Sequence, residues 1–200
     1  MIILDMGSGN TCRNDKREIQ RMIESVYEVD TGKHAVVLKW QLFNEAKPNI
    51  PLTHESFEYA YQIANDLGYQ TTASVFDLEN LNYLKKFEIP FIKIACRQDL
   101  YWLIKHCGKH MVILSSEDTG RVDCDVQLAC IRKYPAKLSE YEKTFDADQL
   151  SYVSDHTVGW ELFNKYNPVV IEKHFVYERL NDNPDAGMFA VTPDELSEVL

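Results

Sequence analysis

Two histidines in the C-terminal part of the sequence each close a short apolar run beside an acidic residue. His156 follows Ser154 and Asp155 at the end of one run, and His174 follows Glu172 at the end of the next. Imidazole nitrogens bind divalent metals, and a carboxylate beside them adds negative charge. Two histidines at equivalent positions on successive runs therefore indicate a candidate metal site.

Two lysines stand where apolar side chains are expected. Lys93 interrupts the run FIKIA, and Lys39 lies inside the run AVVLKW. Burying an ammonium group is costly unless it is paired or bound to an anion, so these positions favour a phosphate-bearing ligand. A plain structural alternative stays open, because a histidine at a strand end often only packs in the core and Lys39 could extend its head group to solvent.

The segments that would position these residues alternate along the chain. Short apolar runs occur at 2–6, 35–40, 69–74, 90–95, 110–116, 126–131, 150–155 and 168–175. Helix-like segments occur at 15–28, 54–67, 78–87, 98–107, 137–144, 158–165 and 192–200, whereas 117–125 is too short for more than one turn. The apolar runs show little alternation, as expected for strands covered on both faces.

Eight strands that alternate with helices predict an α/β fold, a single minimal (β/α)8 TIM barrel over residues 1–200. An open doubly wound sheet is the alternative, and it is disfavoured because no G-x-G-x-x-G follows the first run. In a barrel, the carboxyl ends of the strands meet at one mouth, where active sites lie. Polar residues at these ends are Asp5, Lys39, Gln41, Ser74, Lys93, Ser115, Ser116, Arg132, Tyr134, His156, Glu172 and His174. Cys96 and Cys130 are interpreted as small apolar fillers.

The composition limits the classes of partner. The formal net charge of −10 and the pI near 5.0 argue against nucleic acid and against an anionic membrane surface. The five cysteines contain no C-x-x-C pair, as expected for free thiols in a reducing cytoplasm. No signal peptide is recognisable, and no apolar stretch approaches the roughly 20 residues that span a bilayer. We therefore expect a soluble, cytoplasmic protein.

Several motifs, in order along the chain, resemble those of the sialic acid synthases, a family that includes the legionaminic and pseudaminic acid synthases. The most specific pair is VSDHTVG at 153–159 and VIEKHF at 170–175, followed by NPD, which ends at Asp185. Further similar stretches are VVLKWQ, FIKIAC, KHMVILSS and CIRKYP, which begin at residues 36, 91, 109 and 130. Together they run across nearly the whole chain.

The resemblance implies that phosphoenolpyruvate condenses with the open-chain aldehyde of an aldose and that phosphate is released. It implies a divalent metal, Mn²⁺ or Mg²⁺, held by His156 and His174. The implied catalytic residues are Asp5, Lys93 and Glu172. The implied phosphoenolpyruvate-binding residues are Lys39, Ser74, Lys93, Cys96, Arg132 and Ser154, and those for the sugar are Gln98, Tyr134 and Asp185. A homodimer is compatible with the resemblance.

The sequence also departs from the family pattern. Asp5 replaces a Glu, Ser74 a Thr, Cys96 a Ser, Arg132 an Asn and Gln98 a Glu. The stretch 44–52 is short, and we expect no C-terminal antifreeze-like domain. Acceptor recognition would therefore differ, and we expect little or no turnover of N-acetylmannosamine and activity on a smaller or differently decorated aldose. Two alternatives stay open, namely a Schiff-base aldolase with Lys93 as the nucleophile and a non-catalytic barrel that binds a phosphorylated metabolite or partner.

Overall fold

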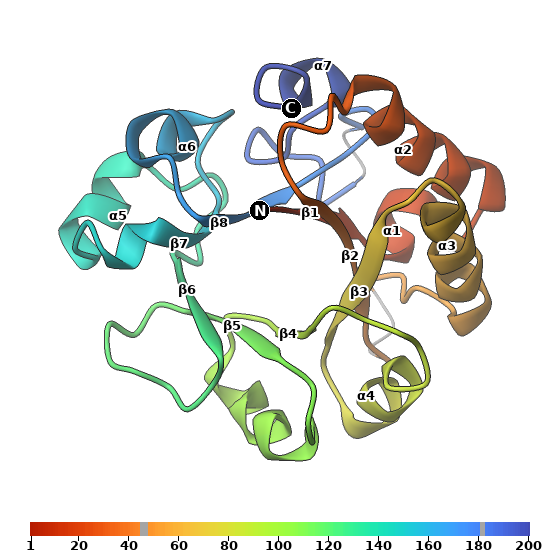
Figure 1. Cartoon of the computed structure of the whole chain (residues 1–200), viewed down its shortest axis with the longest axis horizontal. Helices are drawn as coiled ribbons and strands as arrows, with labels where there is room; N and C mark the ends of the chain where they lie inside the picture. Colours follow the sequence, from red (N-terminus) through yellow and green to blue (C-terminus); the bar gives the residue numbers. More distant parts are fainter. Residues whose placement is uncertain (45–47, 181–182) are drawn as a thin grey trace.

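Eight parallel strands close into a barrel in their sequence order, β1 to β8, in the computed structural model (Figure 1). The structure describes residues 1–44, 48–180 and 183–200. The strands are β1 (Ile2–Gly7), β2 (Val36–Leu42), β3 (Gln70–Val75), β4 (Ile92–Ile94), β5 (Val112–Ser116), β6 (Val126–Cys130), β7 (Tyr152–Asp155) and β8 (Val170–His174). The first strand pairs with the last, from Ile2 opposite Ile171 to Asp5 opposite His174. The predicted TIM barrel is confirmed, and the open-sheet alternative is wrong.

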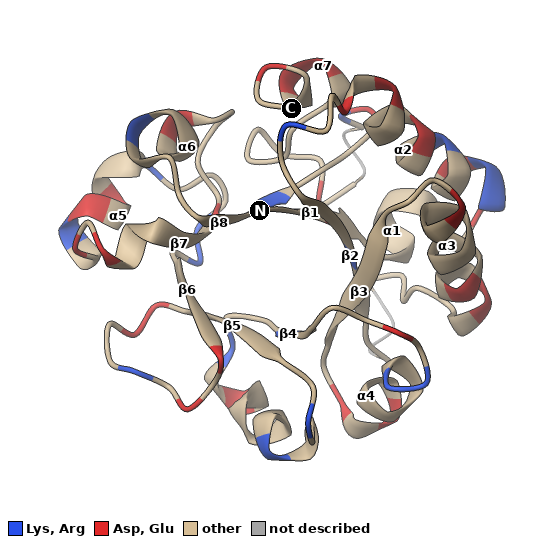
Figure 2. Cartoon of the chain, viewed as in Figure 1, with Lys and Arg blue, Asp and Glu red and all other residues tan. Residues whose placement is uncertain are grey.

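Helices surround the barrel, so the charged residues that they carry lie outside the barrel wall (Figure 2). They are α1 (Gly9–Cys12), α2 (Lys16–Val29), α3 (His54–Asp66), α4 (Leu78–Leu84), η1 (Gln98–His106), α5 (Leu138–Thr144), η2 (Gln149–Ser151), α6 (Glu161–Tyr166) and α7 (Pro193–Leu196). Residues 117–125 contain no helix, as predicted. Two predicted helices differ: 98–107 forms the 3₁₀ helix η1, and only Pro193–Leu196 of the segment 192–200 is helical.

Local sequence accounts for where the long helices begin and what they bury. Asp15 caps α2 by accepting a hydrogen bond from the backbone N–H of Arg17, and Thr53 caps α3 in the same way through Ser56. Helix α2 buries Ile19, Met22, Ile23, Ser25 and Val26. This spacing places the apolar side chains on one stripe of the helix, which packs against the barrel.

The barrel interior is filled by one apolar layer below the mouth. Its buried members are Ile3, Val37, Phe91, Ile113, Leu128 and Val170. Side chains two residues apart on a strand point to the same face, so the residue two positions after each of these also faces the interior. Those positions hold Asp5, Lys39, Lys93, Ser115, Cys130 and Glu172. The apolar layer is therefore the floor of a polar layer at the carboxyl ends of the strands.

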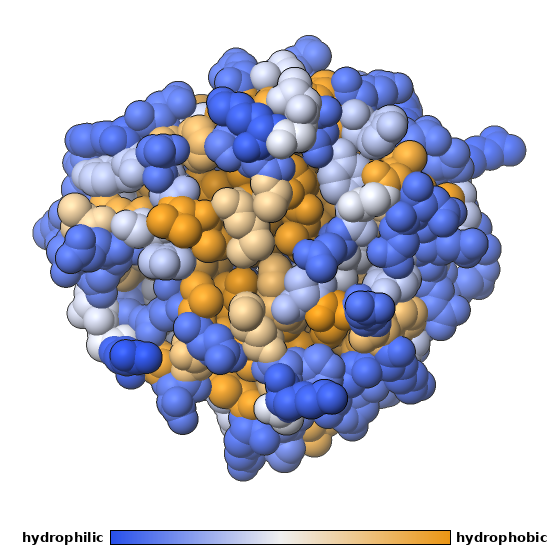
Figure 3. All heavy atoms as spheres, in the orientation of Figure 1, coloured by the Kyte–Doolittle hydropathy of each residue, from blue (hydrophilic) through white to orange (hydrophobic). Residues whose placement is uncertain are grey.

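The outer surface is mixed in polarity. In the view of Figure 3, hydrophobic residues gather near the centre of the face, over the barrel, and hydrophilic residues surround them. Among the residues that the structure describes, every helix is too short or too polar to cross a membrane.

Candidate active site

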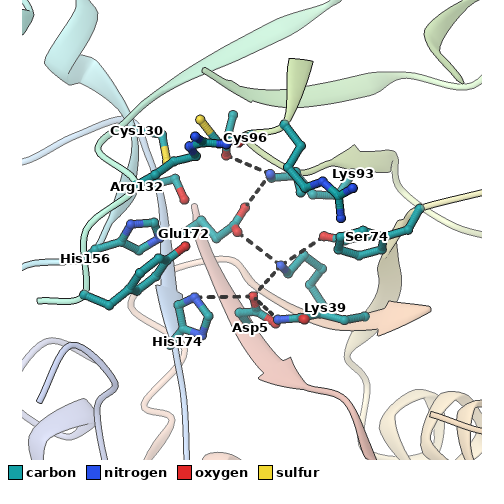
Figure 4. Close-up of a pocket in the computed structure, with 17 residues that line it drawn as sticks. Asp5, Lys39, Ser74, Lys93, Cys96, Cys130, Arg132, His156, Glu172 and His174 are labelled. Atoms are coloured by element: carbon teal, nitrogen blue, oxygen red, sulfur yellow. Dashed lines mark hydrogen bonds and ion pairs between the residues drawn. The ribbon is translucent and has the colours of Figure 1, made fainter. Parts of the chain in front are cut away.

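The polar layer opens into a cavity of about 210 Å³ at the carboxyl ends of the strands (Figure 4). Its lining consists of Asp5, Lys39, Gln41, Ser74, Phe76, Lys93, Ala95, Cys96, Arg97, Ser115, Cys130, Arg132, Tyr134, Ser154, His156, Glu172 and His174. Most residues that the sequence placed at the mouth are thus brought together in one cavity.

Lys39 is the centre of a buried ion-pair network at the floor of this cavity. Its Nζ donates to Asp5 Oδ2 at 2.6 Å, to Glu172 Oε1 at 3.1 Å and to Ser74 Oγ at 3.1 Å. Lys39 is 1% exposed, so these bonds replace water around the ammonium group. The plain alternative, in which Lys39 extends into solvent, is wrong.

Lys93 completes the network from β4. Its Nζ lies 3.2 Å from Glu172 Oε2 and donates to Ser115 Oγ at 2.7 Å and to the carbonyl oxygen of Ile94 at 3.0 Å. Glu172 therefore bridges the two lysines with its two carboxylate oxygens. Two ammonium groups and two carboxylates, those of Asp5 and Glu172, alternate across the cavity floor.

The pairing fixes the charge of the carboxylates. Burial alone would raise the pKa of Asp5, but Lys39 and His174 outweigh it and the pKa falls to about 2. Burial likewise raises the pKa of Glu172, but Lys39 and Lys93 lower it by more, so the net change is a decrease. Burial opposes the charged form of Lys39, yet Asp5 and Glu172 raise its pKa. The two carboxylates and Lys39 are therefore charged near neutral pH.

Two arginines extend the positive charge toward the rim. Arg132 Nε donates to Glu117 at 3.1 Å, and Arg97 Nη2 lies 2.7 Å from Asp99. Neither acid lines the cavity, whereas both arginines do. The lining therefore holds four Lys or Arg side chains against Asp5 and Glu172. These four cations gather at one mouth of a chain with a net charge of −10, and because each is paired with an acid, an anionic ligand would compete with those carboxylates.

The two histidines lie side by side at the ends of β7 and β8, with ring centroids 5.6 Å apart. His156 Nδ1 is 2.7 Å from the carbonyl oxygen of Ile131. Because a carbonyl oxygen only accepts, the proton sits on Nδ1 and the Nε2 lone pair is available. Burial and the neighbouring His174 lower the pKa of His156 to about 3, so the ring is neutral.

The donors at this position fit a divalent metal in part. His174 Nδ1 is buried and makes no hydrogen bond within the described residues, and its Nε2 lies 3.7 Å from Asp5 Oδ2. Two imidazole nitrogens suit Mn²⁺ or a similar borderline ion. Across residues 1–44, 48–180 and 183–200, no three His, Cys, Asp or Glu side chains converge as a ligand group. Oxygen ligands from a substrate or water would have to complete the coordination.

Tyr134 covers the histidines at the mouth. Its ring centroid lies 4.2 Å from that of His156, 5.9 Å from that of His174 and 4.9 Å from that of Phe189. About half of Tyr134 is exposed, so the residue forms a wall between the histidine pair and solvent.

Two residues predicted to contact a sugar do not line this cavity. Gln98 begins η1 and lines an adjacent recess, which shares Cys96 and Arg132 with the main cavity. Asp185 Oδ2 lies 3.5 Å from Thr11 Oγ1, and burial raises the pKa of Asp185. The short stretch 44–52 includes 45–47, which lie outside the described residues.

The sequence analysis did not name three residues of the lining, Phe76, Ala95 and Arg97, and it gave Cys130 only a filler role. Arg97 directly follows FIKIAC, and Phe76 directly follows β3. The signal for both was position, because residues just past a barrel strand also face the mouth.

The comparisons agree with this architecture. The NeuB family model matches residues 23–200, and the search of curated proteins gives no match. A solved N-acetylneuraminic acid (sialic acid) synthetase from Leptospira borgpetersenii serovar Hardjo-bovis has a TM-score of 0.76 at 22% identity, over 98% of this chain and 80% of that one. A putative spore coat polysaccharide biosynthesis protein E from Chromobacterium violaceum has a TM-score of 0.75 at 16% identity, over 98% and 71%.

A truncated 3-deoxy-D-arabino-heptulosonate 7-phosphate synthase from Thermotoga maritima also matches, with a TM-score of 0.67 at 12% identity, over 99% of this chain and 82% of that one. At these identities the structures show a shared fold. The family match covers far more than half of the sequence and confirms the resemblance drawn from its motifs. The chain belongs to the NeuB family.

Proposed function

We propose that this protein is an enzyme of the sialic acid synthase type, which condenses phosphoenolpyruvate with an open-chain aldose and releases phosphate. The observation that carries the proposal is the buried network of Lys39, Lys93, Asp5 and Glu172 on the cavity floor. Membership in the NeuB family and the likeness to a sialic acid synthetase support it.

The cation-rich lining suits a donor with a phosphate and a carboxylate. Lys39, Lys93 and Arg132 would bind these anionic groups, and Ser74 and Ser154 would donate hydroxyl hydrogen bonds. Asp5 and Glu172 hold the two lysines in place while the site is empty of anions. An incoming phosphate would compete for the same ammonium groups, so the lysines are positioned in advance.

The carboxylates can also handle protons. Glu172 and Asp5 are ionised near neutral pH, since their pKa values lie below the usual range. Either can accept the proton of a water molecule that attacks the donor, and Lys93 beside Glu172 would stabilise the negative charge that develops. Burial strengthens both effects because little water competes.

His156 and His174 would hold the divalent metal, Mn²⁺ or Mg²⁺, through the nitrogens that make no protein hydrogen bond. Such a metal supplies Lewis acidity toward an aldehyde oxygen when bound. Tyr134 shields the histidine pair from solvent and would contact the acceptor. Gln98 and Asp185 would contact more distant hydroxyl groups of the sugar.

Phosphate release tests the proposal. Purified protein with Mn²⁺ and phosphoenolpyruvate is assayed across a panel of aldoses, with Lys93→Met as the inactive variant. Lys165→Met is the matched control, because Lys165 pairs with Glu142 on the surface. We expect turnover of at least one aldose, little turnover of N-acetylmannosamine, and loss of activity only in Lys93→Met. Silence across the panel, with no phosphoenolpyruvate binding, would favour a non-catalytic barrel.

The aldolase alternative has its own readout. A Schiff-base lysine must be deprotonated to attack a carbonyl. Here Lys93 Nζ is held by three partners, Glu172, Ser115 and the carbonyl oxygen of Ile94, so it is not free to approach a carbonyl. Borohydride reduction in the presence of pyruvate should therefore leave Lys93 unmodified, and a trapped adduct on Lys93 would replace the synthase proposal.

A further inference from the structure

Two cysteines from different strands meet in the wall of the cavity. Cys130 ends β6, and Cys96 lies just past β4, with β5 between these strands in the barrel. Both line the cavity, and their sulfur atoms lie next to one another in Figure 4. The interpretation of these residues as simple fillers does not account for this contact.

A hydrogen bond also connects the segment after β6 with the segment after β4. Arg132, two residues past Cys130, reaches across to the carbonyl oxygen of Cys96 with its Nη1 at 3.3 Å. The intervening strand β5 ends in Ser115 and Ser116, whose side chains are small.

The two thiols differ in access and in chemistry. Cys96 is partly exposed, whereas Cys130 is buried behind it. The hydrogen bond from Cys130, helped by Lys93 and by the Glu117 backbone, lowers the pKa of Cys96. In contrast, burial raises the pKa of Cys12 and of Cys107 to about 11. A partly exposed thiol beside a cation and two hydrogen-bond donors is the environment of reactive cysteines.

We propose that Cys96 and Cys130 form a redox-sensitive thiol pair, in which a hydroperoxide oxidises Cys96 and Cys130 then closes a disulfide with it. The Cys96 thiolate attacks one oxygen of the hydroperoxide and breaks the O–O bond. With one proton from solvent, this gives a sulfenic acid and an alcohol, or water when the oxidant is hydrogen peroxide. The Cys130 thiol then attacks the Cys96 sulfur, the S–O bond breaks and water leaves. The two sulfurs lose two electrons in total, which the peroxide oxygens receive.

Peptide mapping tests the pair without any activity measurement. Reduced protein is treated with a limited amount of hydrogen peroxide, alkylated and digested with trypsin. Cys96 lies in the tryptic peptide 94–97, whereas Cys124 and Cys130 share the peptide 122–132. The Cys124→Ser variant therefore removes the ambiguity and is also the matched control, because Cys124 is likewise partly exposed but lines a different recess.

We expect the 94–97 and 122–132 peptides to become linked before Cys107 is modified, equally in wild type and in Cys124→Ser, and to separate again with dithiothreitol. Cys130→Ser should stop at a Cys96 sulfenic acid that dimedone traps, and Cys96→Ser should leave Cys130 reduced. Oxidation of Cys96 to a sulfinic acid without linkage to Cys130 would overturn the proposal. Earlier oxidation of Cys124 or Cys107 would overturn it as well.

A second measurement links the pair to the donor site and rests on the proposed function. Cys96 lies among the residues proposed to bind phosphoenolpyruvate, so saturating phosphoenolpyruvate should slow disulfide formation several-fold. Failure to bind phosphoenolpyruvate would count against the proposed function, while the peptide map would still decide the thiol pair. If phosphoenolpyruvate binds but does not slow disulfide formation, the thiols lie outside the donor pocket, and the link between the pair and donor binding is refuted.

Discussion

Two buried clusters of lysine ion pairs lie on opposite faces of the barrel wall, and only one of them opens to a cavity. On the inner face, Lys39 and Lys93 share the carboxylates of Asp5 and Glu172 at the cavity floor. On the outer face, Lys173 Nζ pairs with Asp155 Oδ2 at 3.0 Å. The chemistry of the pairs is the same, so their surroundings decide what each cluster does.

The outer pair is closed off on every side. Lys173 also donates to the carbonyl oxygen of Thr157 at 2.7 Å and lies 5.9 Å above the ring of Trp160. Asp155 accepts from the backbone N–H of Thr157, and neither ionic side chain is exposed. Burial lowers the pKa of Lys173, whereas the pKa of Lys39 is raised by its two carboxylate partners. The outer pair thus joins β7 to β8, while the inner network retains charged groups that face a ligand cavity.

The largest expected effect is the loss of stability when the outer pair is broken. Lys173→Met leaves Asp155 buried without its cation, which typically costs about 3–5 kcal/mol. Guanidinium unfolding should show this decrease in the free energy of unfolding. The double variant Asp155→Asn with Lys173→Met should recover a large part of it. A cost below about 1 kcal/mol for Lys173→Met would mean that the outer pair is no more than a surface-type ion pair.

Breaking the inner network should instead remove the stabilisation of the fold by a bound anionic ligand. Lys93→Met leaves Glu172 paired with Lys39, so the fold should persist. A ligand at a hundredfold excess over its dissociation constant stabilises a protein by about 2.7 kcal/mol. Phosphoenolpyruvate should therefore raise the melting temperature of wild type and of Lys173→Met, but not that of Lys93→Met. An equal thermal shift in all three proteins would place the anion elsewhere.

The dependence of stability on pH should test the inner network through Asp5, whose pKa falls to about 2 from an ordinary value of 3.8. A lowered carboxylate pKa stabilises the fold above the ordinary value, and this stability is lost as the pH falls toward 2. The difference corresponds to about 2 kcal/mol. Asp5→Asn should therefore be less stable than wild type at pH 5, and the gap should narrow between pH 4 and pH 2. Urea unfolding across this range measures it, and curves that stay parallel would refute the assignment to Asp5.

The same two clusters show which parts of the fold and of the site could be predicted from the sequence. The eight apolar runs predicted the barrel because strands covered on both faces lack polar alternation. The motif residues Ser154 and Glu172 face inward and sit opposite one another in the β7–β8 register, as do Asp155 and Lys173 on the outer face. The acidic residue directly before His156 therefore belongs to the structural pair, which only the period-two geometry of a strand reveals.

Contacts that depend on loops could not be predicted in the same way. Arg97 and Phe76 lie just past strands, where position indicates the mouth but not which side chains reach the cavity, and Gln98, the first residue of η1, lines the adjacent recess instead. The approach of Cys96 to Cys130 spans β5, and no sequence spacing encodes an approach between alternate strands. Side chains on strands were thus predictable from periodicity, whereas those just past the strands required coordinates.

The smallest expected effect concerns His174, which connects the two clusters because it follows Lys173 and lies 3.7 Å from Asp5. If its Nδ1 and His156 Nε2 hold a metal, wild type should bind about one Mn²⁺. His174→Ala should weaken that binding at least tenfold, or about 1.4 kcal/mol. The matched control is His110→Ala, since His110 Nδ1 also contacts a carbonyl oxygen, that of Cys107 at 3.0 Å, but lies outside the cavity. Calorimetric titration of chelator-treated protein measures all three. Equal weakening in both variants, or no binding in wild type, would remove the metal from the proposed function and leave the histidine pair with a packing role beneath Tyr134.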